Sequence, residues 1–458
     1  MALVDLDRRV LALAVARMVD AIGNSFLIVV LPAFIASGAV GGSAFGLTQA
    51  LVTGVVLSAF GFLNSFSQPF TGRLSDRVGK RKVFILFGLA VLVVTNLAYV
   101  WATTYTALIG IRVVQGVGVA FTIPCTIALV NELATAETRG GNMGLFNTFR
   151  LVGFGAGPLL AGVVIEAGPY VVGGGAGATV DAATTAAGAA AGGTAATAGQ
   201  AGAVTVPLLG ALPFAATTLS GFDAAFLIAA FTALVGFVMV EFIVEDAEET
   251  RSAASTDVGI SVFADDGDGL LDPVFVMGMI SLFLAIGVAL FATIQPEINA
   301  RLNQGSTVFS AQFSAFILAQ ITLQIPVGQA ADAYGRKALL VLGMALFVPF
   351  TLAQGFVTTQ WGMFLARLFQ GIAGALVFAP ALALAGDLAR EGRSGSTMSV
   401  LTMSFGLGTA LGPLLSGYTI RFGFAAPFAV GAVLAAVGVV LVVTQVEETH
   451  DDPVLWRG

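Results

Sequence analysis

Long apolar runs alternate with short polar segments along almost the whole chain. Most of these runs are about 20 residues or longer, the length at which a helix crosses the hydrocarbon core of a bilayer. Backbone groups in lipid need hydrogen-bond partners within their own segment, so the runs predict α-helices. Twelve helices are expected, with the ranges 10–36, 45–70, 83–103, 106–131, 141–165, 222–244, 274–295, 308–328, 338–357, 361–386, 396–418 and 424–446.

The twelve helices fall into two sets of six, separated by an acidic polar segment. We expect an N-terminal bundle over 1–244, a cytoplasmic linker over 245–272, a C-terminal bundle over 273–446 and a cytoplasmic tail over 447–458. The fold class is therefore an all-α polytopic membrane protein made of two six-helix bundles.

A Gly/Ala/Thr-rich insertion over 167–221 separates the fifth and sixth helices. Gly and Ala contribute little transfer free energy, and Gly-rich stretches resist helix formation. A thirteenth crossing here would also move Arg336, Lys337, Arg390 and Arg393 to the outer side. We therefore expect a flexible external loop rather than another helix.

Basic residues set the orientation, because Lys and Arg in short loops stay on the cytoplasmic side. The loops of one side hold only Arg301 and Arg421. The segments of the other side hold Arg8, Arg9, Arg73, Arg77, Lys80, Arg81, Lys82, Arg139, Arg251, Arg336, Lys337, Arg390, Arg393 and Arg457. We expect both termini in the cytoplasm and the chain in the plasma membrane as a multi-pass protein.

The composition excludes several kinds of chemistry. Hydrophobic residues make up 57% of the chain and charged residues only 10%, well below the share in soluble domains. Cys125 and His450 are the single cysteine and histidine. This composition argues against a disulfide framework, a metal site with cysteine and histidine ligands, and a histidine-based catalytic triad. No phosphate-binding G-x-x-x-x-G-K-[ST] loop occurs. We expect no cofactor and no nucleic acid partner, and an ion gradient as the energy source.

The two halves carry an internal repeat. Residues 112–162 and 367–417 align without a gap at an offset of 255, and 16 of the 51 positions are identical. Pro32 and Pro296 match at an offset of 264. Repeated halves place a binding site at their shared interface near the midplane, as in alternating-access transporters.

A basic loop motif also occurs twice, as GRLSDRVGKRK over 72–82 and GQAADAYGRK over 328–337. Glycines there permit a tight reversal. An anchor on the cytoplasmic side explains the cations, but it does not explain the shared spacing of Gly, Asp and Gly.

These motifs resemble those of the major facilitator superfamily and, within it, the drug:proton antiporter branch. The 72–82 loop matches the superfamily motif between helices 2 and 3, and RVVQGVGVA over 112–120 is similar to its helix 4 motif. The antiporter motif of helix 5 is matched, apart from Ala161 in place of a glycine, by Gly144, Gly153, Gly157, Pro158 and Gly162. Generic helix packing is the alternative explanation for these glycines.

The resemblance implies that the paired loops are gates. Asp76 would face the positive N-terminal end of helix 11, near Thr397, and would hold the cytoplasmic side closed. Asp332 would act in the same way toward helix 5. The gating residues implied are Gly72, Asp76, Arg77, Gly79, Lys80, Arg81, Gly328, Asp332, Gly335, Arg336 and Lys337.

Charged residues inside a membrane are costly and usually functional. Asp20 lies about ten residues into helix 1, and its depth could differ from that of Arg112 by only about 5–6 Å. We expect Asp20 to carry the proton and Arg112 to pair with it across a central cavity. The alternative is a static ion pair that only fixes the packing of the helices.

Further polar residues inside the helices are candidates for lining the substrate cavity. They are Asn24, Gln115, Arg150, Gln320, Gln324, Arg367 and Gln370. Arg150 could bind an anionic substrate group or extend to the cytoplasm along its helix. Any of the amides could instead form an ordinary hydrogen bond between helices.

These features together favour a proton-coupled antiporter that exports small organic or amphipathic compounds by alternating access. Uptake or facilitated transport of an organic metabolite or anion is the alternative within the fold. A receptor or a membrane enzyme is disfavoured, because catalytic residues do not cluster at either interface. We expect a small-molecule substrate, protons or another coupling ion, membrane lipid and a monomeric chain.

Overall fold

The computed structural model of the chain describes residues 7–44, 46–133, 139–172, 204–205, 217–246, 262–263, 270–388 and 394–448. Twelve helices in this part of the chain are long and apolar enough to cross a membrane. The first bundle contains α1 (Arg8–Ala36), α2 (Gln49–Val78), α3 (Arg81–Ala98), α4 (Tyr105–Glu132), α5 (Arg139–Ala167) and α8 (Gly221–Ile243). The second contains α9 (Pro273–Thr293), α11 (Ser306–Tyr334), α12 (Arg336–Ala353), α13 (Gln360–Leu388), α14 (Ser394–Thr419) and α15 (Ala426–Gln445). The all-α class and the twelve crossings are confirmed.

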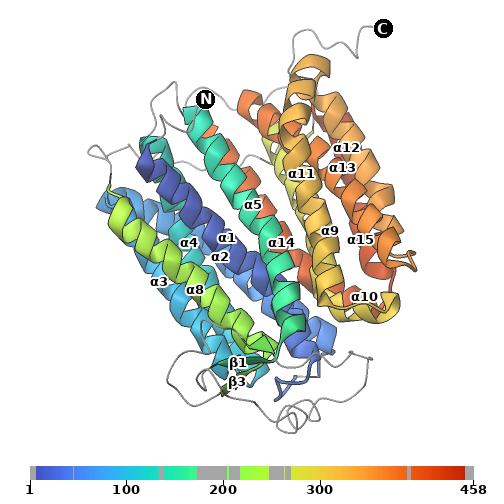
Figure 1. Ribbon diagram of the computed structural model, residues 1–458. Helices are drawn as coiled ribbons and strands as arrows, with labels where there is room; N and C mark the ends of the chain where they lie inside the picture. The colour runs from blue at the N-terminus through green and yellow to red at the C-terminus, as the bar shows by residue number, and fades with distance from the viewer. Residues whose placement is uncertain are drawn as a thin grey trace.

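The two bundles stand side by side, and α1 begins at the same end of the molecule at which α15 ends (Figure 1). We call this the terminal end and the opposite one the far end. Helices α2 and α5 of the first bundle pack against α14 and α11 of the second. Close contacts run from the far end to the middle of these pairs: an added Cβ on Gly54 would lie 2.5 Å from the carbonyl oxygen of Pro413, and one on Gly162 would lie 2.8 Å from that of Ser306.

Both repeated motifs are mostly helical, contrary to the loops expected over 72–82 and 328–337. Helix α2 continues to Val78, and only Gly79 turns the chain, with φ of 70°. Helix α11 continues to Tyr334, and Gly335 turns it with φ of 101°. Gly72 and Gly328 therefore lie inside helices. One glycine costs a helix only about 1 kcal/mol, so it does not end a helix that packs along its length.

The repeated prolines Pro32 and Pro296 differ in their surroundings. Helix α1 continues through Pro32, whereas α9 ends at Thr293 and a short helix, α10 (Gln295–Leu302), begins just before Pro296. Proline fits the first turn of a helix because the amide that it lacks has no partner there. The helix expected over 274–295 therefore ends two residues early, and the short helix α10 that follows it was not expected.

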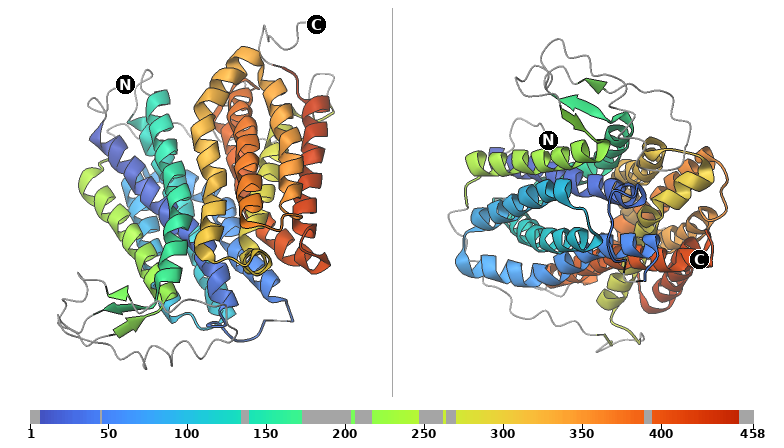
Figure 2. Two further views of the ribbon diagram at one scale, coloured as in Figure 1. Left: turned by 45° about the vertical axis from the view of Figure 1, so that its right-hand side comes forward. Right: turned by 90° about the horizontal axis from the view of Figure 1, so that it is seen from below.

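The insertion between α5 and α8 contains a small sheet, where only a flexible loop was expected. Strands β1 (Tyr170–Val172), β2 (Val204–Thr205) and β3 (Thr217–Leu219) pair in the order β2-β1-β3, parallel on one side and antiparallel on the other (Figure 2). Their β-branched and aromatic residues suit a strand. Residues 173–203 and 206–216 of the insertion lie outside the described residues, as does most of the 245–272 linker.

Glycines set the distance between helices within each bundle. An added Cβ on Gly157 would meet the Ser25 hydroxyl and lie 2.6 Å from the carbonyl oxygen of Ile22 on α1. The repeat partner Gly412 would place a Cβ 3.0 Å from the carbonyl oxygen of Ile286 on α9. Without a hydrophobic force between helices in lipid, such close backbone approach is a main source of attraction.

We predict that Gly157→Ala destabilises the first bundle by about 1–3 kcal/mol, because the new methyl group has no room between α5 and α1. Thermal unfolding of the purified protein in detergent measures the effect. Gly144→Ala on the same helix is the matched control, since no described atom beyond its own stretch of helix lies within 4 Å of its added Cβ. Equal melting temperatures for the two variants would contradict this account of the packing.

Candidate functional site

A buried polar cluster surrounds Arg112 in the first bundle. Arg112 Nη1 donates to Gln115 Oε1 at 3.3 Å, and the hydroxyl of Tyr99 donates to the same oxygen at 2.8 Å. Gln115 Nε2 donates to Asn96 Oδ1 at 2.6 Å. The guanidinium carbon of Arg112 lies 5.1 Å from the ring centre of Phe60. Residues from α2, α3 and α4 thus hold one arginine in a fixed orientation.

A similar cluster surrounds Arg367 in the second bundle. Arg367 Nη1 donates to Gln370 Oε1 at 2.6 Å, and Gln370 Nε2 donates to Thr351 Oγ1 at 2.9 Å. Three phenylalanine rings surround the guanidinium group. Their centres lie 4.3 Å (Phe291), 5.6 Å (Phe313) and 4.9 Å (Phe316) from its carbon atom.

The two clusters are related by the internal repeat. Arg112 and Gln115 correspond to Arg367 and Gln370, as the sequence predicts. At nearly the same offset, Asn96 corresponds to Thr351 and Phe60 to Phe316, four residues that the sequence analysis did not single out. Asn96 and Thr351 are polar residues in largely apolar helices, and this contrast could have identified them in the sequence as members of a buried network. The repeat therefore preserves a buried network and not only a helix pattern.

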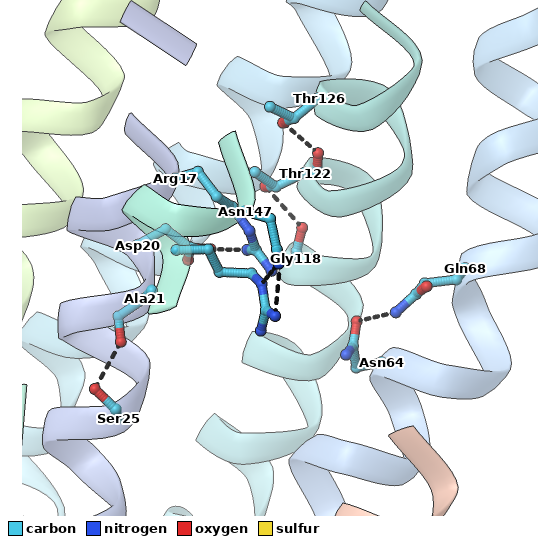
Figure 3. A network of polar contacts seen from close by, with 11 residues as sticks. Arg17, Asp20, Ala21, Ser25, Asn64, Gln68, Gly118, Thr122, Thr126 and Asn147 are labelled. Atoms are coloured by element: carbon cyan, nitrogen blue, oxygen red, sulfur yellow. Dashed lines mark hydrogen bonds and ion pairs between the residues drawn. The ribbon is translucent and has the colours of Figure 1, made fainter. Parts of the chain in front are cut away.

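The structure pairs Asp20 with Arg17 and not with Arg112, so the expected ion pair between Asp20 and Arg112 is wrong. The Nη1 group of Arg17 donates to Asp20 Oδ2 (Figure 3). Residues three apart on a helix lie on one face, which brings Arg17 to Asp20 within α1. Their side chains are only 12% and 4% exposed, so the pair lies in the protein interior.

Arg150 lies close to this ion pair. Its Nε and Nη2 atoms donate to Asn147 Oδ1 at 3.0 and 2.9 Å, one turn nearer the terminal end of α5. Arg150 and Arg17 are near enough for their charges to repel. Two guanidinium groups therefore share the surroundings of one carboxylate, which leaves this region with excess positive charge.

A small pocket connects Asp20 to the Arg112 cluster. It is lined by Asp20 and Asn24 of α1, Phe60 of α2, and Asn96 and Gln115 of α3 and α4. Asn24 and Gln115 thus reach a shared pocket, as proposed for the cavity. This pocket lies inside the first bundle, however, and not between the two bundles.

Other proposed cavity residues lie elsewhere. Arg367 and Gln370 belong to the cluster in the second bundle. Gln320 and Gln324 lie on α11, and neither side chain forms a hydrogen bond within the described part of the chain. The structure therefore distributes the predicted cavity residues over several places.

In the first repeated motif, Arg81 connects two helix ends. It forms ion pairs with Asp76 of α2 and, at 2.8 Å, with Glu132 of α4, and it also donates to the Ser75 hydroxyl. Arg77 and Lys80 are exposed. The expected partner of Asp76 near Thr397 lies outside the residues whose side chains are described. Asp76 is thus held within its own bundle.

Both motifs end at a helix that is capped by a distant carboxylate. The amide of Lys82 donates to Asp246 Oδ1 at 2.8 Å. In the second bundle, the amides of Arg336 and Lys337 donate to Glu448 at 3.1 and 2.9 Å. Carboxylates are stabilised at helix N-termini by the unpaired amides and the helix dipole. Asp332, the expected gating residue of the second motif, is not among the residues whose side chains the structure describes.

A carboxylate that the sequence analysis missed connects the two bundles at the far end. Glu166, near the end of α5, accepts a 3.0 Å hydrogen bond from the amide of Thr307 in the first turn of α11. The N-cap of α11 is Gly305, which has no side chain to supply this bond. Glu166 packs directly on Gly305, so the first bundle caps a helix of the second.

Comparisons with known proteins agree with the fold. A sequence profile described as Major Facilitator Superfamily matches residues 13–180 and 276–455. An uncharacterised MFS-type transporter of Methanocaldococcus jannaschii is 31% identical over 156 residues, which are 34% of this chain and 40% of that protein. Multidrug resistance protein 1 of Bacillus subtilis is 22% identical over 174 residues, which are 38% of this chain and 45% of that protein. Each match spans less than half the length of the relative.

The similarity extends to solved structures. The crystal structure of a D-xylose–proton symporter has a TM-score of 0.70 with 13% identity, over 96% of this chain and 98% of that one. At this identity the likeness concerns the fold alone. Because the profile match covers both bundles and the fold agrees with it, the chain belongs to the Major Facilitator Superfamily.

Proposed function

We propose that the chain is a proton-coupled antiporter that exports small organic or amphipathic compounds. It would act as a monomer in the plasma membrane, with both termini in the cytoplasm, by alternately opening its two ends. One observation carries the proposal. In the described membrane-spanning helices, Asp20 is the one acidic residue more than three positions from a helix end, and its buried side chain lines a small pocket with Asn24 and Gln115. Such a carboxylate is a candidate proton carrier.

The surroundings of Asp20 support a role in coupling. Protonation of Asp20 would neutralise the carboxylate and leave Arg17 without its ion-pair partner, beside the repelling charge of Arg150. Two cationic groups in a low dielectric interact strongly. Proton binding would therefore change the charge near the pocket and, with it, the affinity for a substrate. Arg112 would act indirectly, through Gln115 at the pocket wall.

The helix ends support alternating access. At the far end, Glu166 holds α5 to the N-terminus of α11. At the terminal end, Asp76 would hold α2 to the N-terminus of α14 once the bundles approach there. Only one contact is engaged at a time in this scheme, because rocking brings one end together as the other separates.

The direction of transport is inferred from resemblance. The glycines of α5 and the match to a multidrug resistance protein support export. Import or facilitated transport of an organic anion is the second candidate. It is favoured by the excess of arginine over acid within the membrane, where Arg17, Arg112, Arg150 and Arg367 accompany Asp20.

We predict that Asp20→Asn abolishes substrate movement driven by a pH gradient but preserves substrate exchange, because the variant cannot carry the proton. Proteoliposomes with an imposed gradient, screened against lipophilic cations and organic anions, measure both activities. Asp7→Asn is the matched control, since Asp7 pairs with Arg9 just outside the same helix. Uphill transport by the Asp20 variant would exclude Asp20 as the carrier.

We also predict that Glu166→Gln favours opening of the far end, since it removes a negative charge at the N-terminus of α11. The effect is about 1 kcal/mol, or roughly fivefold in the equilibrium between conformations. Spin labels at the exposed positions Trp101 and Trp361, in a chain with Cys125→Ser, report the far-end distance. We expect a larger population at long distance.

Asp76→Asn should act at the terminal end instead. There, labels at Val78 and Tyr334, which the repeat relates, should show the longer distances. An unchanged far-end distribution in Glu166→Gln would show that this contact does not hold the bundles together.

A further inference from the structure

Arg367 is isolated in an apolar part of the second bundle. In the described membrane-spanning helices of that bundle, it is the one charged residue more than three positions from a helix end. It is fully buried, and no acidic side chain among the described residues forms an ion pair with it. An isolated cation in a low dielectric is costly, so such a residue normally has a compensating partner.

The hydrogen bonds of Arg367 leave one edge of the guanidinium group unused. Nη1 donates to Gln370, which fixes the orientation of the group. Nε and Nη2 are buried without a partner among the described residues. These two atoms form the edge that binds a carboxylate through two parallel hydrogen bonds.

Other arginines of this chain use the same edge for an oxygen ligand. Nε and Nη2 of Arg81 both donate to Glu132, at 3.1 and 2.8 Å. The same atoms of Arg9 donate to Asp7, and those of Arg150 donate to Asn147. In these three arginines the Nε and Nη2 donors both have an acceptor. In Arg367 the same two donors are buried and have none among the described residues.

The aromatic rings around Arg367 reach the seam between the bundles. Phe313 of α11 contacts the guanidinium group and also lies 6.4 Å, between ring centres, from Phe154 of α5. Phe291 and Phe316 complete an apolar wall. Because Phe154 and Phe313 belong to different bundles, a rocking motion would separate these rings and open a path to Arg367.

We propose that the Nε–Nη2 edge of Arg367 binds the carboxylate of a transported organic acid, whose apolar body packs against the rings of Phe291, Phe313 and Phe316. One pair of donors without a second cation suits a singly charged carboxylate better than a multiply charged phosphate. A lipophilic cation would be repelled. This inference rests on the proposed transport function and specifies its substrate class.

The test compares two probes of the same size and shape, 4-phenylbutyrate and its neutral amide, which differ in the charge and hydrogen-bonding groups of the head group, by calorimetry on the purified protein. We expect the protein to bind the carboxylate at least about tenfold more tightly than the amide, because hydrogen bonds to a charged acceptor are stronger than those to a neutral one. Arg367→Gln should lose this preference. Arg367→Lys should retain part of this preference, because lysine keeps the positive charge but cannot donate two parallel hydrogen bonds to one carboxylate.

Two further variants separate recognition from folding. Phe313→Leu should weaken both probes while retaining the preference for the carboxylate, because only the apolar wall is changed. Arg301→Gln removes an arginine at the far end that stacks on Phe424, and it should leave both affinities unchanged.

Equal binding of the two probes by the unmodified protein, or a retained preference in Arg367→Gln, would overturn the assignment. Transport driven by a pH gradient would then still support antiport, with a different substrate class. A carboxylate preference that depends on Arg367 in a protein that ignores the pH gradient would support the assignment and refute proton coupling.

Discussion

The structure depends on the cost of burying a polar group inside the membrane without a hydrogen-bond partner, which draws neighbouring helices into shared polar networks. Water cannot satisfy these groups, so each one constrains the helices that surround it. Gln115 illustrates the effect. It accepts from Arg112 and Tyr99 and donates to Asn96, so a single side chain fixes the positions of α3 and α4 relative to each other. Glycines then bring the remaining helices into contact, and the close packing makes each bundle a rigid unit.

The internal repeat preserves this rigid framework and varies the charges placed on it. Arginine and glutamine recur at equivalent positions, and each bundle has a helix that a distant carboxylate caps at the terminal end. Asp20, by contrast, has Leu284 at the equivalent position. Glu166 also differs from its repeat partner, which is Arg421. The repeated helices α2 and α11 are capped differently, because Thr48 caps α2 from its own N-cap position whereas α11 is capped by Glu166 of the other bundle. The shared features hold each bundle together, and the differences place different charges in the two halves.

The sequence was sufficient to predict the fold, because lipid selects helices of a definite length and composition. All twelve apolar runs became helices, and the repeat located the related arginines. The continuation of α2 and α11 through their motifs is not predictable from glycine alone, because glycine permits a turn but packing keeps Gly72 and Gly328 helical. The partner of Asp20 was also missed. The depth of a residue in the membrane cannot decide whether Asp20 pairs with Arg17 or with Arg112. The pairing depends on how each helix is rotated about its axis and on the side-chain rotamers. Glu166 required the contact between bundles, which no pattern within one helix reveals.

The separation of charge between the bundles suggests how proton and substrate could be coupled. Among the described membrane-spanning helices, the first bundle contains the one carboxylate more than three positions from a helix end, with arginines beside it. In the second bundle the one charged residue at such a position is Arg367, which is enclosed by aromatic rings. A proton on Asp20 and an anion at Arg367 would alter the charge of different rigid units. The two units meet where Phe154 contacts Phe313, so a change in one is transmitted to the other only through their relative motion. Coupling of this kind requires no direct contact between proton and substrate. The proton and the substrate need only favour different relative orientations of the two bundles.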